Sequence, residues 1–314
     1  MSFEVITSPS NPRVKWAASL RDARDRKREG CIVIDGASNI EHAVAGGIEC
    51  AELFLAERLE LFLAEPGSAA EPGSAADSGS ASQQRHQEAS NAYEWRKRFP
   101  GLKVTLLGPQ AMSKLQYGDR DLGEIAVAKM PDTSIETLNE RIAGRSSVTV
   151  PEAPQLFLVL DRMEKPGNLG AILRTADAAG ATAVLMSDPI CEIWNPNAIR
   201  SSLGAIFRVP IGVGTESGVR KWLDGRGVAL FAARADGGTD YSTVPYPSRT
   251  AVVVGSEALG LENRWSNQGV TSVHIPMGGV IDSLNASVSG SILVFEVIRQ
   301  WRNSANARER TNNP

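Results

Sequence analysis

Residues 155–180, QLFLVLDRMEKPGNLGAILRTADAAG, place a strand pattern directly before a helix pattern. Residues 155–161 are apolar almost throughout, which is typical of a parallel strand covered by helices on both faces. From residue 168 onward the apolar residues recur with the helical period of about 3.6. A strand that leads through a short polar loop into a helix is the repeating unit of an α/β sheet.

The same alternation continues downstream to residue 302. Further strands are expected at 182–187, 208–213, 228–233, 250–255 and 272–277, and helices at 195–205, 217–227 and 283–302. We therefore predict a doubly wound α/β domain with a parallel sheet. Ligands of such sheets bind at the carboxyl ends of the strands. The site is accordingly expected in the loops at 161–168, 255–260 and 275–287.

A smaller α/β pattern covers residues 1–130. An insertion at about 57–88 interrupts it, where EPGSAA occurs twice in tandem and is followed by Gly, Ser and Ala. Such a composition cannot bury enough apolar surface to offset the entropy of ordering, so we expect a mobile loop. The polar stretch 131–154 is expected to connect the two domains, the larger domain to occupy 155–303, and 304–314 to form a polar tail.

The net charge of −3 is unevenly distributed along the chain. Residues 52–82 carry six acids and one base, so their local charge is −5 and that of the remaining chain is +2. Basic residues gather in two clusters: Arg13, Lys15, Arg21, Arg24, Arg26, Lys27 and Arg28, expected on one helix, and Arg96, Lys97, Arg98 and Lys103. Such clusters are typical either of a solvated helix face or of a surface that neutralises phosphates.

Cysteine, histidine and hydropathy patterns exclude several classes of protein. Cys31, Cys50 and Cys191 are odd in number and widely spaced, which fits reduced core residues better than a disulfide framework. No apolar run reaches the roughly eighteen residues of a membrane span, and the N-terminus lacks a signal-peptide core. We therefore predict a cytoplasmic chain without a membrane segment. The three scattered histidines have no ligand spacing, so no metal is expected.

Two nucleotide-binding patterns are incomplete. Residues 212–218, GVGTESG, imitate a dinucleotide fingerprint, but Ser217 stands where the third glycine would allow close helix packing. Residues 167–175, GNLGAILRT, lack the Gly-Lys-Ser/Thr of a phosphate-binding loop. These departures weigh against nucleotide hydrolysis and dinucleotide chemistry.

Three segments at strand ends carry unexpected polar residues. Asn168 is expected to cap the helix that carries Arg174, with Gly170 allowing close backbone approach. Glu257 follows a buried strand, where a carboxylate is costly unless it is hydrogen-bonded. Small polar residues open the last helix and offer hydroxyl, amide and backbone donors to a ligand: Ser283, Asn285, Ser287 and Ser289.

Taken together, NLGAILR (168–174), GSEALG (255–260), IPMGG (275–279) and SLNAS (283–287) resemble the motifs of the SpoU/TrmH branch of the SPOUT superfamily. The resemblance spans nearly all of 155–303, with the motifs in the family's order and spacing. Residues 32–44, IVIDGASNIEHAV, make the N-terminal part similar to a substrate-binding domain related to ribosomal protein L30e.

The resemblance implies a methyltransferase that uses S-adenosylmethionine to modify a ribose 2′-hydroxyl of RNA. It also implies a deep trefoil knot in the C-terminal domain. The residues implied to contact the cofactor are Ala233, Gly255, Ser256, Ile275, Met277, Ser283, Leu284, Asn285 and Ser287.

The catalytic residues that the resemblance implies are Arg174, Asn168, Glu257 and Asn285. A 2′-hydroxyl is a poor nucleophile, so a group must align it and accept its proton. Arg174 would act as the base, helped by a substrate phosphate, or would only position phosphate and hydroxyl, since arginine normally stays protonated. Asn168 would orient Arg174 or the ribose, and Glu257 would anchor the arginine or its loop. Asn285 would line the reacting centre or only cap a helix.

The expected partners are rRNA and a second copy of the chain. Basic clusters on a separate domain suit structured 23S rRNA, because shape and phosphate recognition need an extended positive surface. The last helix is apolar around much of its circumference, which suits a homodimer. Resistance to a ribosome-targeting antibiotic is a further expectation. The alternatives are a tRNA 2′-O-methyltransferase, a tRNA base methyltransferase and a non-catalytic RNA- or ribosome-binding protein of the same fold; the target nucleotide is not identified.

Overall fold

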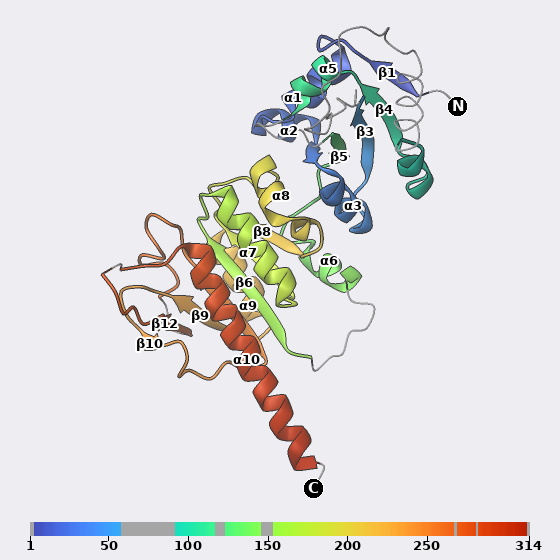
Figure 1. The fold of residues 1–314 in the computed structure, drawn as a ribbon. Helices are drawn as coiled ribbons and strands as arrows, with labels where there is room; N and C mark the ends of the chain where they lie inside the picture. The colour runs from blue at the N-terminus through green and yellow to red at the C-terminus, as the bar shows by residue number, and fades with distance from the viewer. Residues whose placement is uncertain are drawn as a thin grey trace, which may run out of the picture. The chain divides into compact units, whose positions relative to one another are not determined.

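The computed structural model describes residues 3–57, 92–116, 123–145, 153–266, 269–280 and 282–312. The chain divides into two compact units, Met1–Met130 and Pro131–Pro314 (Figure 1). The insertion predicted at 57–88 lies outside the described residues from residue 58 onward.

The first unit is built on a mixed sheet with the strand order β1-β4-β3-β5-β2. Its strands are β1 (Glu4–Ile6), β2 (Cys31–Asp35), β3 (Cys50–Ala56), β4 (Lys103–Leu107) and β5 (Glu124–Lys129). Its helices are α1 (Pro12–Ser19), α2 (Ala23–Glu29), α3 (Ala37–Ala45), the helix at 92–98 and α5 (Pro109–Leu115). Apolar side chains of α1 and α5 pack with the strands in one core, which includes Val14, Phe54 and Leu115.

The first basic cluster was expected on one helix, and that expectation is wrong. The chain breaks after α1, and the Asp22 side chain caps α2 by accepting from the Arg24 backbone N–H at 2.8 Å. Arg26 is buried, and its guanidinium donates to the carbonyl of Leu20 at 2.8 Å. Arg13 pairs with Glu52, which is also buried. Part of the cluster therefore holds the unit together and does not face solvent.

The second unit contains a seven-stranded parallel sheet with the order β10-β12-β9-β11-β6-β7-β8. Its strands are β6 (Gln155–Asp161), β7 (Ala183–Ser187), β8 (Ile211–Gly214), β9 (Ala229–Ala233), β10 (Thr239–Asp240), β11 (Arg249–Val254) and β12 (Val270–His274). Its helices are α6 (Leu138–Arg145), α7 (Pro166–Ala178), α8 (Pro196–Ser202), α9 (Glu216–Asp224) and α10 (Ala286–Asn312), with a 3₁₀ turn at Ala205–Phe207. The predicted parallel α/β sheet is thereby confirmed, whereas the trefoil crossing stays a prediction.

Both ends of the second unit extend further than the sequence pattern indicated. The stretch predicted as a connection contains α6, and its Ile135 and Leu138 join the buried core. Ser134 also forms a parallel bridge with Val213 of β8. Two apolar residues among polar ones are enough to dock this stretch onto the sheet. At the other end α10 continues to Asn312 through the predicted tail, and Figure 1 shows it running beside α7 and past the sheet.

Parallel strands end on the same edge of a sheet, and this edge gathers the loops of interest. The strands β12, β9, β11 and β6 are neighbours in the sheet, so the loops that follow them lie next to one another. α7, which follows the loop after β6, packs closely on α8 through Gly170. A Cβ placed on Gly170 would lie 1.9 Å from Ser201 Oγ, 2.7 Å from Ser202 N and 2.8 Å from Ala198 O.

We expect Gly170→Ala to lower the free energy of unfolding by about 1–3 kcal/mol, because two of the three atoms that it would strike are backbone atoms. Urea denaturation of the full chain measures this difference. The matched control is Gly167→Ala on the same helix, where a Cβ meets nothing within 4 Å. Equal stability of the two variants would contradict the close packing of α7 on α8.

Candidate functional site

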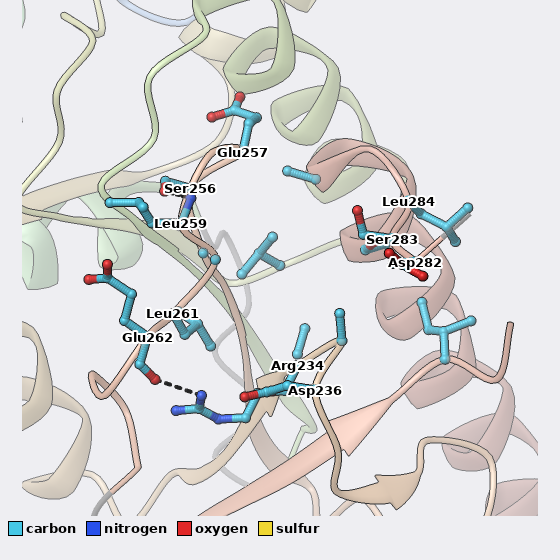
Figure 2. Close-up of a pocket in the computed structure, with 18 of the residues that line it drawn as sticks. Arg234, Asp236, Ser256, Glu257, Leu259, Leu261, Glu262, Asp282, Ser283 and Leu284 are labelled. Carbon is cyan, nitrogen blue, oxygen red and sulfur yellow. Dashed lines mark hydrogen bonds between the residues drawn. The ribbon is translucent and has the colours of Figure 1, made fainter. Parts of the chain in front are cut away.

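A pocket of about 450 Å³ opens at the carboxyl ends of β9, β11 and β12 (Figure 2). Its walls come from the ends of these strands, from the loop after β11 and from the start of α10. In Figure 2, Ser283 and Leu284 lie across the pocket from Ser256 and Leu261, with Arg234 and Asp236 beneath them. Seven of the predicted cofactor residues line the pocket: Ala233, Gly255, Ser256, Ile275, Met277, Ser283 and Leu284. Asn285 and Ser287 do not line it.

The loop after β11 is held in a tight turn by two glycines. The Ser256 backbone N–H donates to the Gly260 carbonyl at 3.2 Å, and the Gly260 N–H donates back to the Ser256 carbonyl at 3.0 Å. A Cβ on Gly255 would lie only 2.2 Å from the carbonyl carbon of Gly260, and Gly260 itself has a φ of 59°. This turn explains why the sequence has glycine at both 255 and 260, and the residues of the turn line the pocket.

Glu257 joins the three loops beside this pocket. Its Oε1 accepts a hydrogen bond from Asn168 Nδ2 at 2.6 Å, and its Oε2 lies 3.4 Å from the backbone N–H of Glu164. Asn168 Oδ1 in turn accepts from Asn285 Nδ2 at 3.1 Å. The structure therefore links residues 168, 257 and 285 into one chain of hydrogen bonds, although up to 117 positions separate them.

The expected capping role of Asn168 is wrong. α7 begins at Pro166 with Lys165 as its N-cap, so Asn168 lies within the first helical turn. Proline is favoured at the first helical position, which moves the start of the helix upstream and leaves the Asn168 amide to reach Glu257. Asn285 does bond as a capping residue does: its Oδ1 accepts from the Ser287 backbone N–H at 2.8 Å and from Ser287 Oγ at 2.6 Å.

Arg174 stands apart from this chain of hydrogen bonds. It is exposed on α7, and within the described residues no hydrogen bond or ion pair joins it to Asn168, Glu257 or Asn285. Six residues along an α-helix correspond to about 600° of rotation, so Asn168 and Arg174 point to different sides of α7. The next residue, Thr175, touches Ser291 of α10 at 2.7 Å between the two hydroxyls.

Two arginines that the sequence did not single out shape the loop after β11. Arg234 lines the pocket and donates to the carbonyls of Glu262 and Arg264, both at 2.7 Å. Arg264 pairs with Asp161, whose side chain is fully buried at the end of β6. The partners of Arg234 are backbone carbonyls, which leave no signal in a sequence. Asp161 lies 103 positions from its partner Arg264. We found no pattern in the sequence that could have paired these residues.

Cys191 provides a titratable group next to Glu257. Burial, and after it the negative charge of Glu257, raise the pKa of the Cys191 thiol to about 11. The backbone N–H of Cys191 donates to the Met163 carbonyl at 2.9 Å, which brings the loop after β7 beside the loop after β6. At neutral pH this thiol is protonated and a poor nucleophile.

Neither a cluster of metal ligands nor a helix able to span a membrane occurs in the described ranges. There, no group of three or more His, Cys, Asp or Glu side chains is arranged to hold a metal ion. No helix within the same residues is long and apolar enough to span a lipid bilayer.

A parallel sheet, a pocket at its carboxyl edge and a polar cluster built from the loops after β6, β11 and β12 are the features of an α/β enzyme. Residues 155–295 match the model of the SpoU rRNA Methylase family, and residues 11–90 match the MRM3-like substrate binding domain. The chain belongs to the SpoU rRNA methylase family. The predicted family, fold class and RNA methyltransferase class are confirmed.

Similar proteins support this assignment over most of the chain. A relative from Streptomyces viridochromogenes, named 23S rRNA (uridine(2479)-2′-O)-methyltransferase, is 30% identical over an alignment of 192 residues, and the match covers 55% of this chain and 67% of that protein. A solved RNA 2′-O ribose methyltransferase is 32% identical with a TM-score of 0.69, covering 94% of this chain and 98% of that one. AviRb from Streptomyces viridochromogenes, solved with the cofactor AdoMet, shares the fold with a TM-score of 0.71 at 24% identity, covering 92% of this chain and 98% of that one.

The electrostatic effect of Glu257 on Cys191 can be tested without an activity assay. We expect Glu257→Gln to speed alkylation of Cys191 by iodoacetamide at pH 9, because loss of the carboxylate charge lowers the pKa of the thiol and raises its thiolate fraction. Mass spectrometry of the alkylated peptides measures the rate for each cysteine. Cys50, whose pKa burial alone raises to about 11, is the internal control. Equal Cys191 rates in the two proteins would contradict the described geometry.

Proposed function

We propose that this chain transfers a methyl group from S-adenosylmethionine to a ribose 2′-hydroxyl of 23S rRNA. The observation that carries the proposal is the Glu257–Asn168–Asn285 chain of hydrogen bonds beside a pocket at the carboxyl edge of the sheet. The names of the relatives support the reaction and the choice of rRNA. The nucleotides in these names are those that the relatives modify, and the nucleotide modified by this chain is not identified.

The pocket suits a folded adenosyl ligand. Its volume of about 450 Å³ lies within the usual range of small-molecule sites. Gly255, Ile275 and Leu284 would contribute mainly backbone groups, which can read the edge of an adenine, while Met277 and Leu261 add apolar surface. S-adenosylmethionine supplies a methyl group on a sulfonium, which is already activated for transfer and needs no metal.

The hydrogen bonds around Asn168 suggest a positioning role for this residue. Its amide nitrogen donates to Glu257, and its amide oxygen accepts from Asn285. With both ends engaged, Asn168 would hold Glu257 and Asn285 in place more than it would touch the ribose. Glu257, which lines the pocket itself, is then the member of the chain nearest the ligand.

Arg174 is proposed to bind the phosphate next to the target ribose. Its exposed guanidinium is available to an incoming RNA, and arginine suits bidentate contact with phosphate. Holding the hydroxyl in line with the sulfonium methyl lowers the entropic part of the barrier. This role does not require arginine to lose its proton; the proton that the 2′-hydroxyl releases on methylation would then pass to solvent water.

The first unit is proposed to bind the RNA. It carries the match to a substrate binding domain, and several side chains of its first basic cluster remain exposed, namely Lys15, Arg24 and Lys27. Such side chains neutralise phosphates without reading sequence. A second copy of the chain is proposed to pack on α10, where Val288 and Phe295 remain 45% and 46% exposed. Antibiotic resistance and the cytoplasmic location stay predictions.

The proposal is tested by incubating the purified chain with methyl-labelled cofactor and separate pools of 23S rRNA, 16S rRNA and tRNA. We expect label in 23S rRNA and a 2′-O-methylated nucleotide that resists alkaline hydrolysis. Label in tRNA alone, or on a base, would replace the proposal with one of the alternative methyltransferases. Cofactor binding in calorimetry without transfer to any pool would support the non-catalytic reading.

Arg174→Ala is expected to lower kcat by about 100-fold or more while the Kd for S-adenosylmethionine stays within about twofold, because the side chain lies outside the pocket. Single-turnover methylation and calorimetry measure the two quantities. Arg174→Lys, which keeps a phosphate-binding charge, is expected to recover part of the rate. A fully active Arg174→Ala enzyme would remove the residue from the mechanism.

A further inference from the structure

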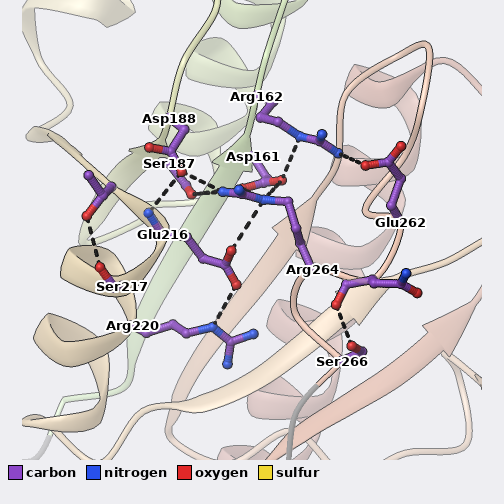
Figure 3. Close-up of polar contacts among 12 residues, drawn as sticks. Asp161, Arg162, Ser187, Asp188, Glu216, Ser217, Arg220, Glu262, Arg264 and Ser266 are labelled. Carbon is purple, nitrogen blue, oxygen red and sulfur yellow. Dashed lines mark hydrogen bonds and ion pairs between the residues drawn. The ribbon is translucent and has the colours of Figure 1, made fainter.

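A network of charged side chains lies behind the pocket loop (Figure 3). Arg264 Nε donates to Asp161 Oδ2 at 2.9 Å, and Nη2 donates to Asp161 Oδ1 at 2.9 Å and to Asp188 Oδ2 at 2.6 Å. Asp161 ends β6, Asp188 follows β7, and Glu216, whose Oε2 lies 3.4 Å from Arg264 Nε, opens α9. One guanidinium thus ties the end of the pocket loop to three other elements.

Further contacts hold the same loop: two arginines bond to Glu262 and Arg264, and a third packs on Trp265. Arg234 donates to the carbonyls of Glu262 and Arg264, and Arg162 pairs with Glu262 at 2.9 Å. The ring of Trp265 is fully buried and lies 4.4 Å from the guanidinium carbon of Arg220. Residues 262–265 are therefore held on several sides. The turn at 256–260 is closed by its own two backbone hydrogen bonds and by the Ser256 hydroxyl, and it is joined to α7 through the Glu257 side chain.

Backbone strain gathers at this network. Among the described residues, five that are not glycine have a positive φ, and four of them belong to the network: Arg162 (50°), Asp188 (44°), Glu262 (45°) and Trp265 (54°). Such conformations cost of order 1 kcal/mol or more each and persist only where surrounding contacts enforce them. The energy stored here implies that the path of this loop is fixed by its contacts and would relax without them.

We propose that Arg264 is a positioning residue that clamps the loop 255–265 in the shape that binds S-adenosylmethionine. The inference rests on the proposed function, because it assigns the pocket to that ligand. Arg264 does not line the pocket, while the eight consecutive residues Gly255 to Glu262, which precede it, do. The clamp acts by removing the cost of ordering this wall when the ligand binds.

The buried partner explains why the clamp holds in one geometry. The Asp161 side chain is fully buried and that of Arg264 is 26% exposed, so neither charge is well solvated. A buried carboxylate without its partner is strongly unfavourable, and a planar guanidinium meets two carboxylates through separate N–H groups. Lysine at this position could neutralise Asp161 but could not reproduce the paired contacts.

The test compares Arg264→Met, Arg264→Lys and the double variant Asp161→Asn/Arg264→Met with the wild-type chain. We expect Arg264→Met to raise the Kd for S-adenosylmethionine about tenfold and KM in parallel, with kcat at saturating cofactor within about threefold, because the bound ligand restores the loop. The Kd of Arg264→Lys should lie between those of wild type and Arg264→Met. The control is Arg249→Met at the opposite end of β11, where the Arg249 guanidinium donates to the Arg226 carbonyl at 3.1 Å. The Kd of this variant for S-adenosylmethionine should equal that of wild type.

The double variant separates positioning from stability. It removes the unpaired buried charge, so its melting temperature should recover toward wild type while its Kd stays raised. A Kd that returns to the wild-type value in the double variant would overturn the clamp and assign the effect to the buried charge. A kcat that collapses together with kcat/KM in Arg264→Met would also overturn it.

Hydrogen exchange of the free protein gives a readout that is independent of the ligand. Amides of 255–264 should exchange faster in Arg264→Met and in the double variant than in wild type, since opening of the loop becomes easier. If wild type binds no S-adenosylmethionine but the variants loosen this segment, the proposed function fails and the clamp stands. Unchanged amide exchange of 255–264 in both variants would contradict the positioning role of Arg264.

Discussion

The site depends on a carboxylate that follows a buried strand. Glu257 comes three residues after the end of β11, and its oxygens find the Asn168 amide and the Glu164 backbone N–H. Glu257 is half-buried, so its carboxylate requires hydrogen-bond partners in place of the water that it loses. The requirement links the loop after β11 to the start of α7, and Asn168 extends the link to the start of α10. Three loops are thus fixed by the demands of one side chain.

Close backbone approaches make this arrangement possible. Gly255 lies so near Gly260 that any side chain would collide, and the resulting turn presents a wall of backbone groups to the pocket. Gly170 similarly lets α7 approach α8. The sequence pattern predicted a close backbone approach at Gly170, and the contacts with Ser201 and Ser202 show that a neighbouring helix makes this approach. Glycine in a motif therefore reports a close approach, but the partner in that approach has to come from the structure.

Local patterns predicted the elements well and long-range partners poorly. Apolar strands and amphipathic helices placed the loops at the correct edge of the sheet, because periodicity reports burial directly. Asn168 was misassigned because Pro166 begins the helix earlier than a capping asparagine would. Arg26 was expected at the surface, yet it is buried and bonds to main-chain carbonyls. Asp161 and Arg264 were missed altogether, since a pair separated by 103 positions leaves no trace in a single sequence.

The position of Arg174 bears on how the reaction is completed. Hydrogen bonds join Glu257, Asn168 and Asn285 to one another, whereas Arg174 is exposed beside the contact between α7 and α10. A guanidinium in water is strongly solvated and gains little until a phosphate with matching geometry displaces that water. The RNA would therefore bring the final element of the site, and the phosphate that meets Arg174 would also align the neighbouring hydroxyl. Binding energy from the polynucleotide is then used to position the reacting atoms, which makes a free nucleoside a poor substrate even though it carries the same hydroxyl.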